Sequence, residues 1–139
     1  MGRNLAPVLG VLLAGVTAVP AAAQRPADPS PIVISEPRPS PVLPAALIPF
    51  TISSGACRKG HVPIVTMRVY NSLAQAVATL RLRQHGDLVL DSIPLKCGDY
   101  VAVWDGTIDE GTRVAPPGVY WLQLNVDDRR SARQVLVRP

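Results

Sequence analysis

The sequence predicts an all-β protein, a β-sandwich of seven strands, from three observations. Short runs rich in Val, Ile, Leu and Tyr alternate with polar residues, as in half-buried strands. Turn residues separate these runs at intervals of about 8 to 12 residues, which is typical of a sandwich. No stretch after residue 23 shows a long helical period. The expected strands cover residues 47–52, 63–70, 75–83, 88–93, 100–105, 118–126 and 132–137.

Residues 1–23 predict an export segment. Arg3 precedes an apolar run over residues 5–23 that ends in three alanines, and such small residues fit cleavage by signal peptidase after Ala23. A retained membrane anchor is the alternative, because about 20 apolar residues can span a bilayer. Membrane contact is then expected through residues 5–23 alone. In both cases the rest of the chain is expected in the periplasm or at the outer face of a membrane.

Prolines recur throughout residues 24–46, and the whole chain contains 15. Proline fixes φ and lacks an amide donor, so this segment is expected to be an extended, polyproline-like arm outside the folded domain. It serves either as a semi-rigid spacer or as a docking arm, since apolar residues stand between the prolines. The expected partner contacts of a docking arm are Ile32, Val33, Ile34, Val42 and Leu43.

The expected domain over residues 47–139 begins with an edge strand, because Pro49 removes a hydrogen-bond donor from residues 47–52. Further along, Tyr120 and Trp121 are adjacent on one strand, so their side chains face opposite sides of the sheet. One of the two rings is therefore exposed, and we expect Trp121 to contact a partner.

A motif between residues 103 and 120 reads V-W-D-G-x-x-D-E-G-x-x-V-x-P-P-G-V-Y. It resembles the flagellar hook-capping-type immunoglobulin-like domain, and the resemblance extends over residues 47–139. The resemblance implies a seven-stranded immunoglobulin-like sandwich, used for scaffolding, subunit contacts or carriage to the cell surface, with no active site. The glycine that the family usually has at Ala74 or Gln75 is absent here. The matching core and turn residues are Trp104, Asp105, Gly106, Gly111, Pro117, Gly118 and Tyr120.

Cys57 and Cys97 are the two cysteines, and an exported chain meets an oxidising compartment. Each stands next to a loop glycine, and we expect a disulfide between them. Closing this loop stabilises the fold by about 4 kcal/mol in the chain-entropy model.

Several functions are not expected from this composition. The net charge of +4 comes from scattered arginines, without the basic patch of a nucleic-acid-binding protein. His61 and His85 are isolated and belong to no triad-like motif, so we expect no enzyme. Asp105, Asp109 and Glu110 share one loop, but their spacing lacks a calcium-loop pattern, and neither a metal nor a cofactor is expected. Whether this loop binds an ion stays open.

The sequence therefore predicts a non-enzymatic structural subunit that stabilises a larger, membrane-associated envelope complex through its sandwich and its proline-rich arm. A module that binds a ligand or glycan through exposed aromatic residues is the alternative, and a secretion or sorting domain is another.

Overall fold

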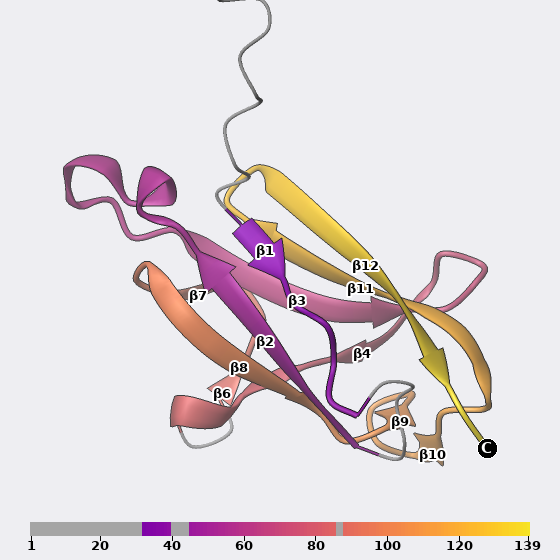
Figure 1. Ribbon diagram of the computed structural model, residues 1–139. Helices are drawn as coiled ribbons and strands as arrows, with labels where there is room; N and C mark the ends of the chain where they lie inside the picture. Colours follow the sequence, from indigo (N-terminus) through magenta and orange to yellow (C-terminus); the bar gives the residue numbers. More distant parts are fainter. Residues whose placement is uncertain (1–31, 40–44, 86–87) are drawn as a thin grey trace, which may run out of the picture.

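The computed structural model describes residues 32–39, 45–85 and 88–139 (Figure 1). The expected export segment, Val42 and Leu43 lie outside these residues. No helix in the described ranges is long and apolar enough to cross a membrane. The described residues contain three short 3-10 turns, η2 (Ser54–Ala56), η3 (Arg58–Gly60) and η4 (Arg83–His85). The strands are β1 (Ile32–Ile34), β2 (Ala46–Ile52), β3 (Ile64–Tyr70), β4 (Ala76–Thr79), β5 (Arg81–Leu82), β6 (Leu88–Val89), β7 (Ile93–Pro94), β8 (Gly98–Trp104), β9 (Thr107–Ile108), β10 (Arg113–Val114), β11 (Gly118–Val126) and β12 (Arg129–Val137).

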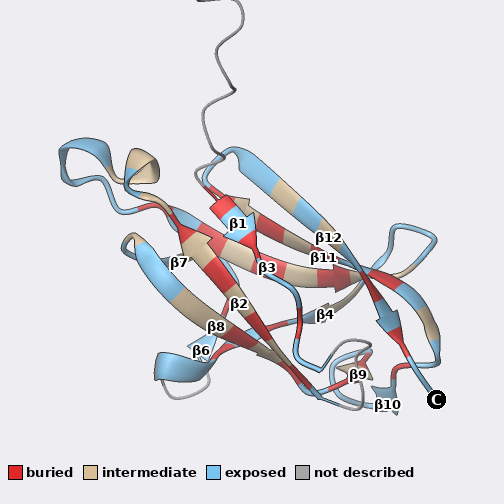
Figure 2. Cartoon of the chain, in the orientation of Figure 1, coloured by how far each residue is buried: buried red, intermediate tan, exposed pale blue. Residues whose placement is uncertain are grey.

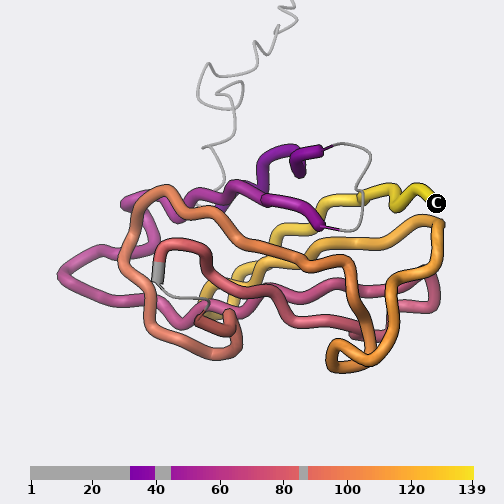
Figure 3. Tube along the Cα trace, turned by 90° about the horizontal axis from the view of Figure 1, so that it is seen from below, coloured from indigo at the N-terminus to yellow at the C-terminus, as the bar shows by residue number. Residues whose placement is uncertain are grey.

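The strands form antiparallel sheets, which confirms the all-β class. One sheet has the order β1-β2-β8-β5-β6, and we call it sheet A. The other has the order β12-β11-β3-β4, with β7 also paired to β3, and we call it sheet B. A small hairpin of β9 and β10 lies where the chain passes from β8 to β11 (Figures 1 and 3).

The core lies between the two sheets and follows from the alternation of apolar residues. In β2 every second residue is buried, from Ala46 to Ile52, and β11 buries alternate residues from Tyr120 to Val126 (Figure 2). Because successive side chains on a strand point to opposite faces, each sheet has one inner apolar face. The largest fully buried side chains are Trp104, Phe50, Ile32, Ile48, Ile52, Met67, Leu80, Leu82, Leu90, Leu122 and Leu124.

The segment that was expected to be a free arm contributes a strand to sheet A. Ile32 pairs with Ile52 and Ile34 with Phe50. Both isoleucines are buried, at 1% and 5% exposure, because their alternate positions point into the core. The interpretation of Ile32 and Ile34 as partner contacts is therefore wrong. The folded part of the chain begins before residue 47.

Pro49 does not mark an edge strand, because β2 lies between β1 and β8. The Pro49 carbonyl accepts from Ser35 N at 2.9 Å, so the imide nitrogen of Pro49 points toward the same neighbour. Pairing with β2 then breaks and resumes only where Arg38 and Leu47 exchange two backbone hydrogen bonds. The missing donor of proline thus coincides with the irregular end of β1, where a sheet tolerates it.

Two runs that were expected to be single strands each cross from one sheet to the other. Residues 75–83 form β4 in sheet B and β5 in sheet A, and residues 88–93 divide between β6 in sheet A and β7 in sheet B. The crossings meet at Leu80 and Leu90, since Leu90 N donates to Leu80 O at 2.9 Å and Leu80 N donates to Met67 O. Both leucines are fully buried, which holds this side of the sandwich closed.

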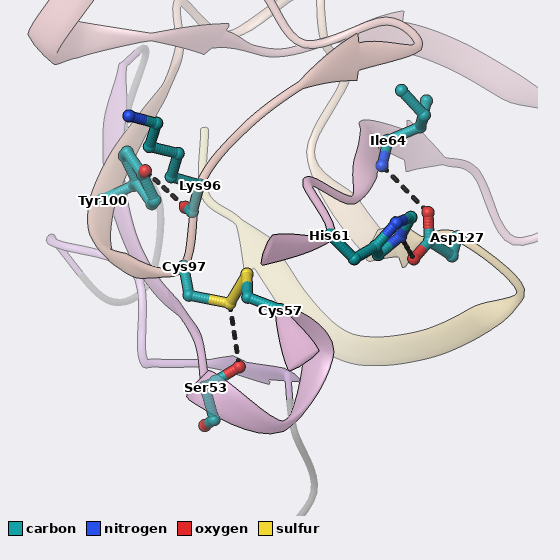
Figure 4. Close-up of a disulfide and its surroundings, with 8 residues drawn as sticks. All are labelled: Ser53, Cys57, His61, Ile64, Lys96, Cys97, Tyr100 and Asp127. Atoms are coloured by element: carbon teal, nitrogen blue, oxygen red, sulfur yellow. Dashed lines mark hydrogen bonds and ion pairs between the residues drawn. A yellow bond between two sulfur atoms is a disulfide. The ribbon is translucent and has the colours of Figure 1, made fainter. Parts of the chain in front are cut away.

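Cys57 and Cys97 form the expected disulfide, with Cα atoms 6.2 Å apart and a separation of 40 positions in the sequence (Figure 4). Cys57 stands between η2 and η3, and Cys97 directly precedes β8. The bridge therefore fixes the long β2–β3 connection to the start of a central strand. Cys97 Sγ also lies 3.0 Å from the Ser53 carbonyl oxygen, a contact and not a hydrogen bond, because a bridged sulfur carries no proton.

We predict that Trp104→Ala destabilises the protein by about 3 to 5 kcal/mol, because Trp104 is 1% exposed and the surrounding core cannot fill the cavity. Urea unfolding of the purified chain measures the loss. Trp121→Ala is the matched control, since Trp121 is 43% exposed and its removal leaves no internal cavity. Equal losses for the two variants would contradict this assignment of the core.

Candidate binding surface

The motif around Trp104 is a connection that joins the two sheets. Trp104 ends β8 in sheet A, and Tyr120 lies near the start of β11 in sheet B. Their rings meet edge to face, with centroids 5.7 Å apart. The indole Nε1 donates to Thr107 O at 2.9 Å, and the Tyr120 hydroxyl donates to Pro116 O at 2.7 Å. Both polar atoms of the buried rings are thus satisfied by the connecting loop itself.

Turn residues shape this connection. Gly106 has φ +81° and Gly111 has φ +85°, a backbone conformation that residues with a Cβ rarely adopt. Asp109 and Glu110 also have positive φ, at the tip of the β9–β10 hairpin. The exposed Pro117 precedes Gly118, with which β11 begins.

The carboxylates of this loop stabilise the turn. Asp105 Oδ1 accepts from Thr107 N at 2.9 Å and from Thr107 Oγ1 at 2.6 Å. These hydrogen bonds, that of the Thr107 side chain first, lower the pKa of Asp105 below its ordinary value. Asp109 Oδ2 accepts from Arg113 Nε at 2.8 Å. The described residues contain no group of three or more acidic, histidine or cysteine side chains placed to hold a metal ion.

Because Tyr120 faces the core, Trp121 faces outward. Tyr120 is 6% exposed and Trp121 is 43% exposed. Burial raises the pKa of the Tyr120 hydroxyl, the main effect on this group. Trp121 lies directly opposite Tyr70 of β3 on one side and Gln134 of β12 on the other. The second large ring of the motif thus belongs to the outer face of sheet B.

Apolar side chains continue from Trp121 across this outer face. Val119, two residues earlier on β11, is 38% exposed and pairs with Leu136 of β12, which is 47% exposed. We call Val119, Trp121 and Leu136 the apolar stripe. Cross-strand and same-face neighbours of this kind are in contact range, so the three side chains form one patch.

A polar groove of about 510 Å³ adjoins the stripe at Trp121. It runs over β3, β11 and β12 and is bounded by the turn between β3 and β4. Ala132 and Ala74 are small beside the two aromatic rings, and this difference in size hollows the surface. The lining residues are Tyr70, Asn71, Ser72, Ala74, Trp121, Gln123, Asn125, Arg130 and Ala132.

The other expected contact residues do not lie on the same face as Trp121. Val33 is 45% exposed, but it stands on β1 of sheet A and pairs with Thr51. Ile32 and Ile34 are buried, as described above, and Val42 and Leu43 lie outside the described residues. Trp121 alone of this group belongs to the stripe on sheet B.

A polar cluster that no sequence pattern indicated lies at Asp127, in the turn between β11 and β12 (Figure 4). Asp127 Oδ1 accepts from Ile64 N at 3.0 Å, and Asp127 Oδ2 lies 2.8 Å from His61 Nε2. Asp127 N donates to Ile64 O at 2.9 Å. The Ile64 hydrogen bond, followed by that of His61, lowers the pKa of Asp127. His61 therefore helps to fix the hairpin to the start of β3.

Comparisons with protein-family models, with curated proteins and with solved structures found no match to this chain. The resemblance to the hook-capping-type domain therefore depends on the residues of the motif alone.

We predict that Asp127→Asn lowers stability above pH 3.8, the ordinary value of an aspartate, and has a smaller effect in acid. A carboxylate whose pKa is depressed on folding stabilises the fold above its unfolded pKa, and this contribution is lost as pH falls through the lower folded value. Denaturant unfolding between pH 2 and 7 measures the difference. Asp128→Asn, at the next position of the turn, is the control. Parallel curves for wild type and Asp127→Asn at every pH would refute the assigned role.

Proposed function

We propose that this chain is a non-enzymatic module of immunoglobulin-like fold, exported to the periplasm or the outer face of a membrane. There it stabilises a larger protein complex by docking the apolar stripe of sheet B on a partner. The observation that carries the proposal is the outward position of Trp121, Val119 and Leu136 on adjacent strands. The regular alternation of β11 thus places two large apolar side chains on the solvent side of the sheet.

The strand order supports the immunoglobulin-like assignment. Such sandwiches place strands A, B, E and D in one sheet and C, F and G in the other. When β1, β2, β3, β5, β8, β11 and β12 are lettered A to G in chain order, A, B, E and D lie side by side in sheet A, and C, F and G lie side by side in sheet B. The strands β4, β6 and β7 are additional. The Tyr120 hydroxyl that reaches back to Pro116 O matches the tyrosine corner of these domains.

Ala74 adds support for the resemblance to the hook-capping-type family. Its φ is +63°, in the left-handed region that favours glycine. The family usually has a glycine at this position or the next. The backbone geometry that a glycine would serve is therefore present here, with alanine in its place.

The Cys57–Cys97 disulfide supports an exported location. Disulfides persist in the periplasm and outside the cell, whereas cytosolic proteins keep their thiols reduced. The bridge fits this location whether residues 1–23 are cleaved or retained.

The burial of Ile32 and Ile34 moves the proposed contact from the arm to the sheet. The stripe extends onto β12 through Leu136, and β12 is the outermost strand of sheet B and pairs with β11. Arg130 lies on β12 opposite Asn125 of the outer face, and Arg138 follows the strand. We therefore propose a protein partner with an apolar centre and an acidic rim, because complementary charge around an apolar patch guides docking.

A Leu136→Ser and Val119→Ser double variant tests this proposal. The tagged full-length chain, expressed in its own host, is followed by native electrophoresis of mildly solubilised envelopes. We expect wild type to migrate within a large complex and the double variant to migrate as a free chain, because a polar stripe loses its apolar contact. Leu88→Ser is the matched control, since Leu88 is 43% exposed on β6, which belongs to sheet A and not to the sheet that contains the stripe.

Thermal unfolding of the purified variants establishes that they remain folded. Migration of the wild type as a free chain, or of the folded double variant within the complex, would contradict the proposal.

A further inference from the structure

The groove beside the stripe differs from it in chemistry. Along β11 its floor contains Trp121, Gln123 and Asn125, which are two residues apart and share the outer face. These side chains extend over about 13 Å of strand. Tyr70 stands opposite Trp121, and Arg130 stands opposite Asn125. The groove therefore has two aromatic rings at one end, a guanidinium group at the other end, and two side-chain amides between them.

The polar groups on the groove floor are left without partners. Among the described residues, no hydrogen bond or ion pair engages the side chains of Tyr70, Gln123, Asn125 or Arg130. Asn125 Oδ1 is buried and has no hydrogen-bond partner there. Buried polar atoms are nearly always hydrogen-bonded, so the unpaired oxygen favours a rotation of the Asn125 amide toward the groove when a ligand there offers it a partner.

The polar residues at the border of the groove behave differently. Asn71 Nδ2 donates to Gln75 Oε1 at 2.9 Å, and Asn71 Oδ1 accepts from two backbone amides of the same turn. Arg68, next to Gln123 on the sheet, pairs with Asp91 at 2.9 Å. Asn71 and Arg68 at the border are thus paired within the protein, whereas the polar side chains of the floor are open to a ligand.

The charge of the groove is also one-sided. The outward positions of β3, β11 and β12 that surround it contain two cations, Arg68 and Arg130, and no carboxylate, and Arg68 is already paired with Asp91. Asn125 and Arg130 are direct cross-strand neighbours, so one ligand group can reach both. A guanidinium binds a carboxylate with two parallel hydrogen bonds.

We propose that this groove binds an acidic oligosaccharide, with one sugar ring stacked on Trp121 and the carboxylate of a uronic acid residue on Arg130. Sugar hydroxyls both donate and accept, so they satisfy the Gln123 and Asn125 amides in either orientation. The apolar face of a pyranose ring fits an exposed indole that has a polar border. The site is separate from the proposed protein contact, although Trp121 borders both.

A peptide partner fits these groups less well. The unpaired floor side chains require several donors and acceptors within about 13 Å, next to a single aromatic surface. A protein contact of that kind is expected on the stripe, where the side chains are apolar. Nucleic acid is disfavoured because one arginine supplies too little charge for a phosphate backbone.

Titration of the purified full-length chain with trisaccharides of galacturonic and mannuronic acid tests the proposal. Side-chain amide signals in a ¹⁵N NMR spectrum and calorimetry are the two readouts. We expect at least one acidic trisaccharide to bind and to shift the Gln123 and Asn125 amide signals. Galactotriose, which has the same length without the carboxylates, is expected to bind about tenfold more weakly, because it loses the charged hydrogen bonds.

The variants separate this site from the docking stripe. Arg130→Gln is expected to reduce affinity for the acidic trisaccharide about tenfold, to the level of galactotriose, and Asn125→Ala to weaken both sugars. Gln134→Ala, on the same outer face but outside the groove, should leave binding unchanged. The Leu136→Ser and Val119→Ser variant should also bind normally, so a failure of the proposed protein contact leaves this result unaffected.

Absence of binding by both acidic trisaccharides at millimolar concentration would overturn the proposal. So would binding that is equally strong for galactotriose, or that survives both Arg130→Gln and Asn125→Ala in folded protein.

Discussion

The edge-to-face contact of Trp104 and Tyr120 determines how the two sheets of this protein are joined. One ring comes from β8 and the other from β11, with centroids 5.7 Å apart. The loop between them supplies the carbonyls of Thr107 and Pro116 that satisfy the indole and the phenol. Since Tyr120 must face inward to complete this contact, Trp121 is required to face outward. The internal packing of the motif thus creates the external surface.

That surface has two chemically distinct parts on one sheet. The apolar part lies on β11 and on the outermost strand, β12, and consists of Val119, Trp121 and Leu136. The polar part consists of Gln123, Asn125 and Arg130, whose side chains pair with no described residue. The acidic residues of the Asp105–Asp109 loop do not belong to it, because Thr107 and Arg113 engage them in the turn. The carboxylates of this loop therefore stabilise the turn and do not contribute to the outer face of sheet B.

Local patterns predicted what depends on local structure. Strict alternation predicted the strand over residues 118–126 with its observed bounds, and the expectation of an oxidising compartment predicted the disulfide. The pattern could not reveal β1, because three apolar residues among prolines form a strand only when β2 is present to pair with them. Leu80 and Leu90 fit a continuous alternation, so the crossings between sheets were invisible. The groove depends on register: Arg130 faces Asn125 only because the hairpin turns at Asp127 and Asp128.

The two tryptophans lie in opposite environments, Trp104 in the core and Trp121 on the outer face of sheet B. Acrylamide quenching of the single-tryptophan variants Trp104→Phe and Trp121→Phe tests this difference directly, since the chain contains two tryptophans. We expect Trp121, alone in Trp104→Phe, to emit at long wavelength and to be quenched readily. Trp104, alone in Trp121→Phe, should emit at shorter wavelength and resist quenching. Equal quenching of the two indoles, or the reverse order, would contradict the account.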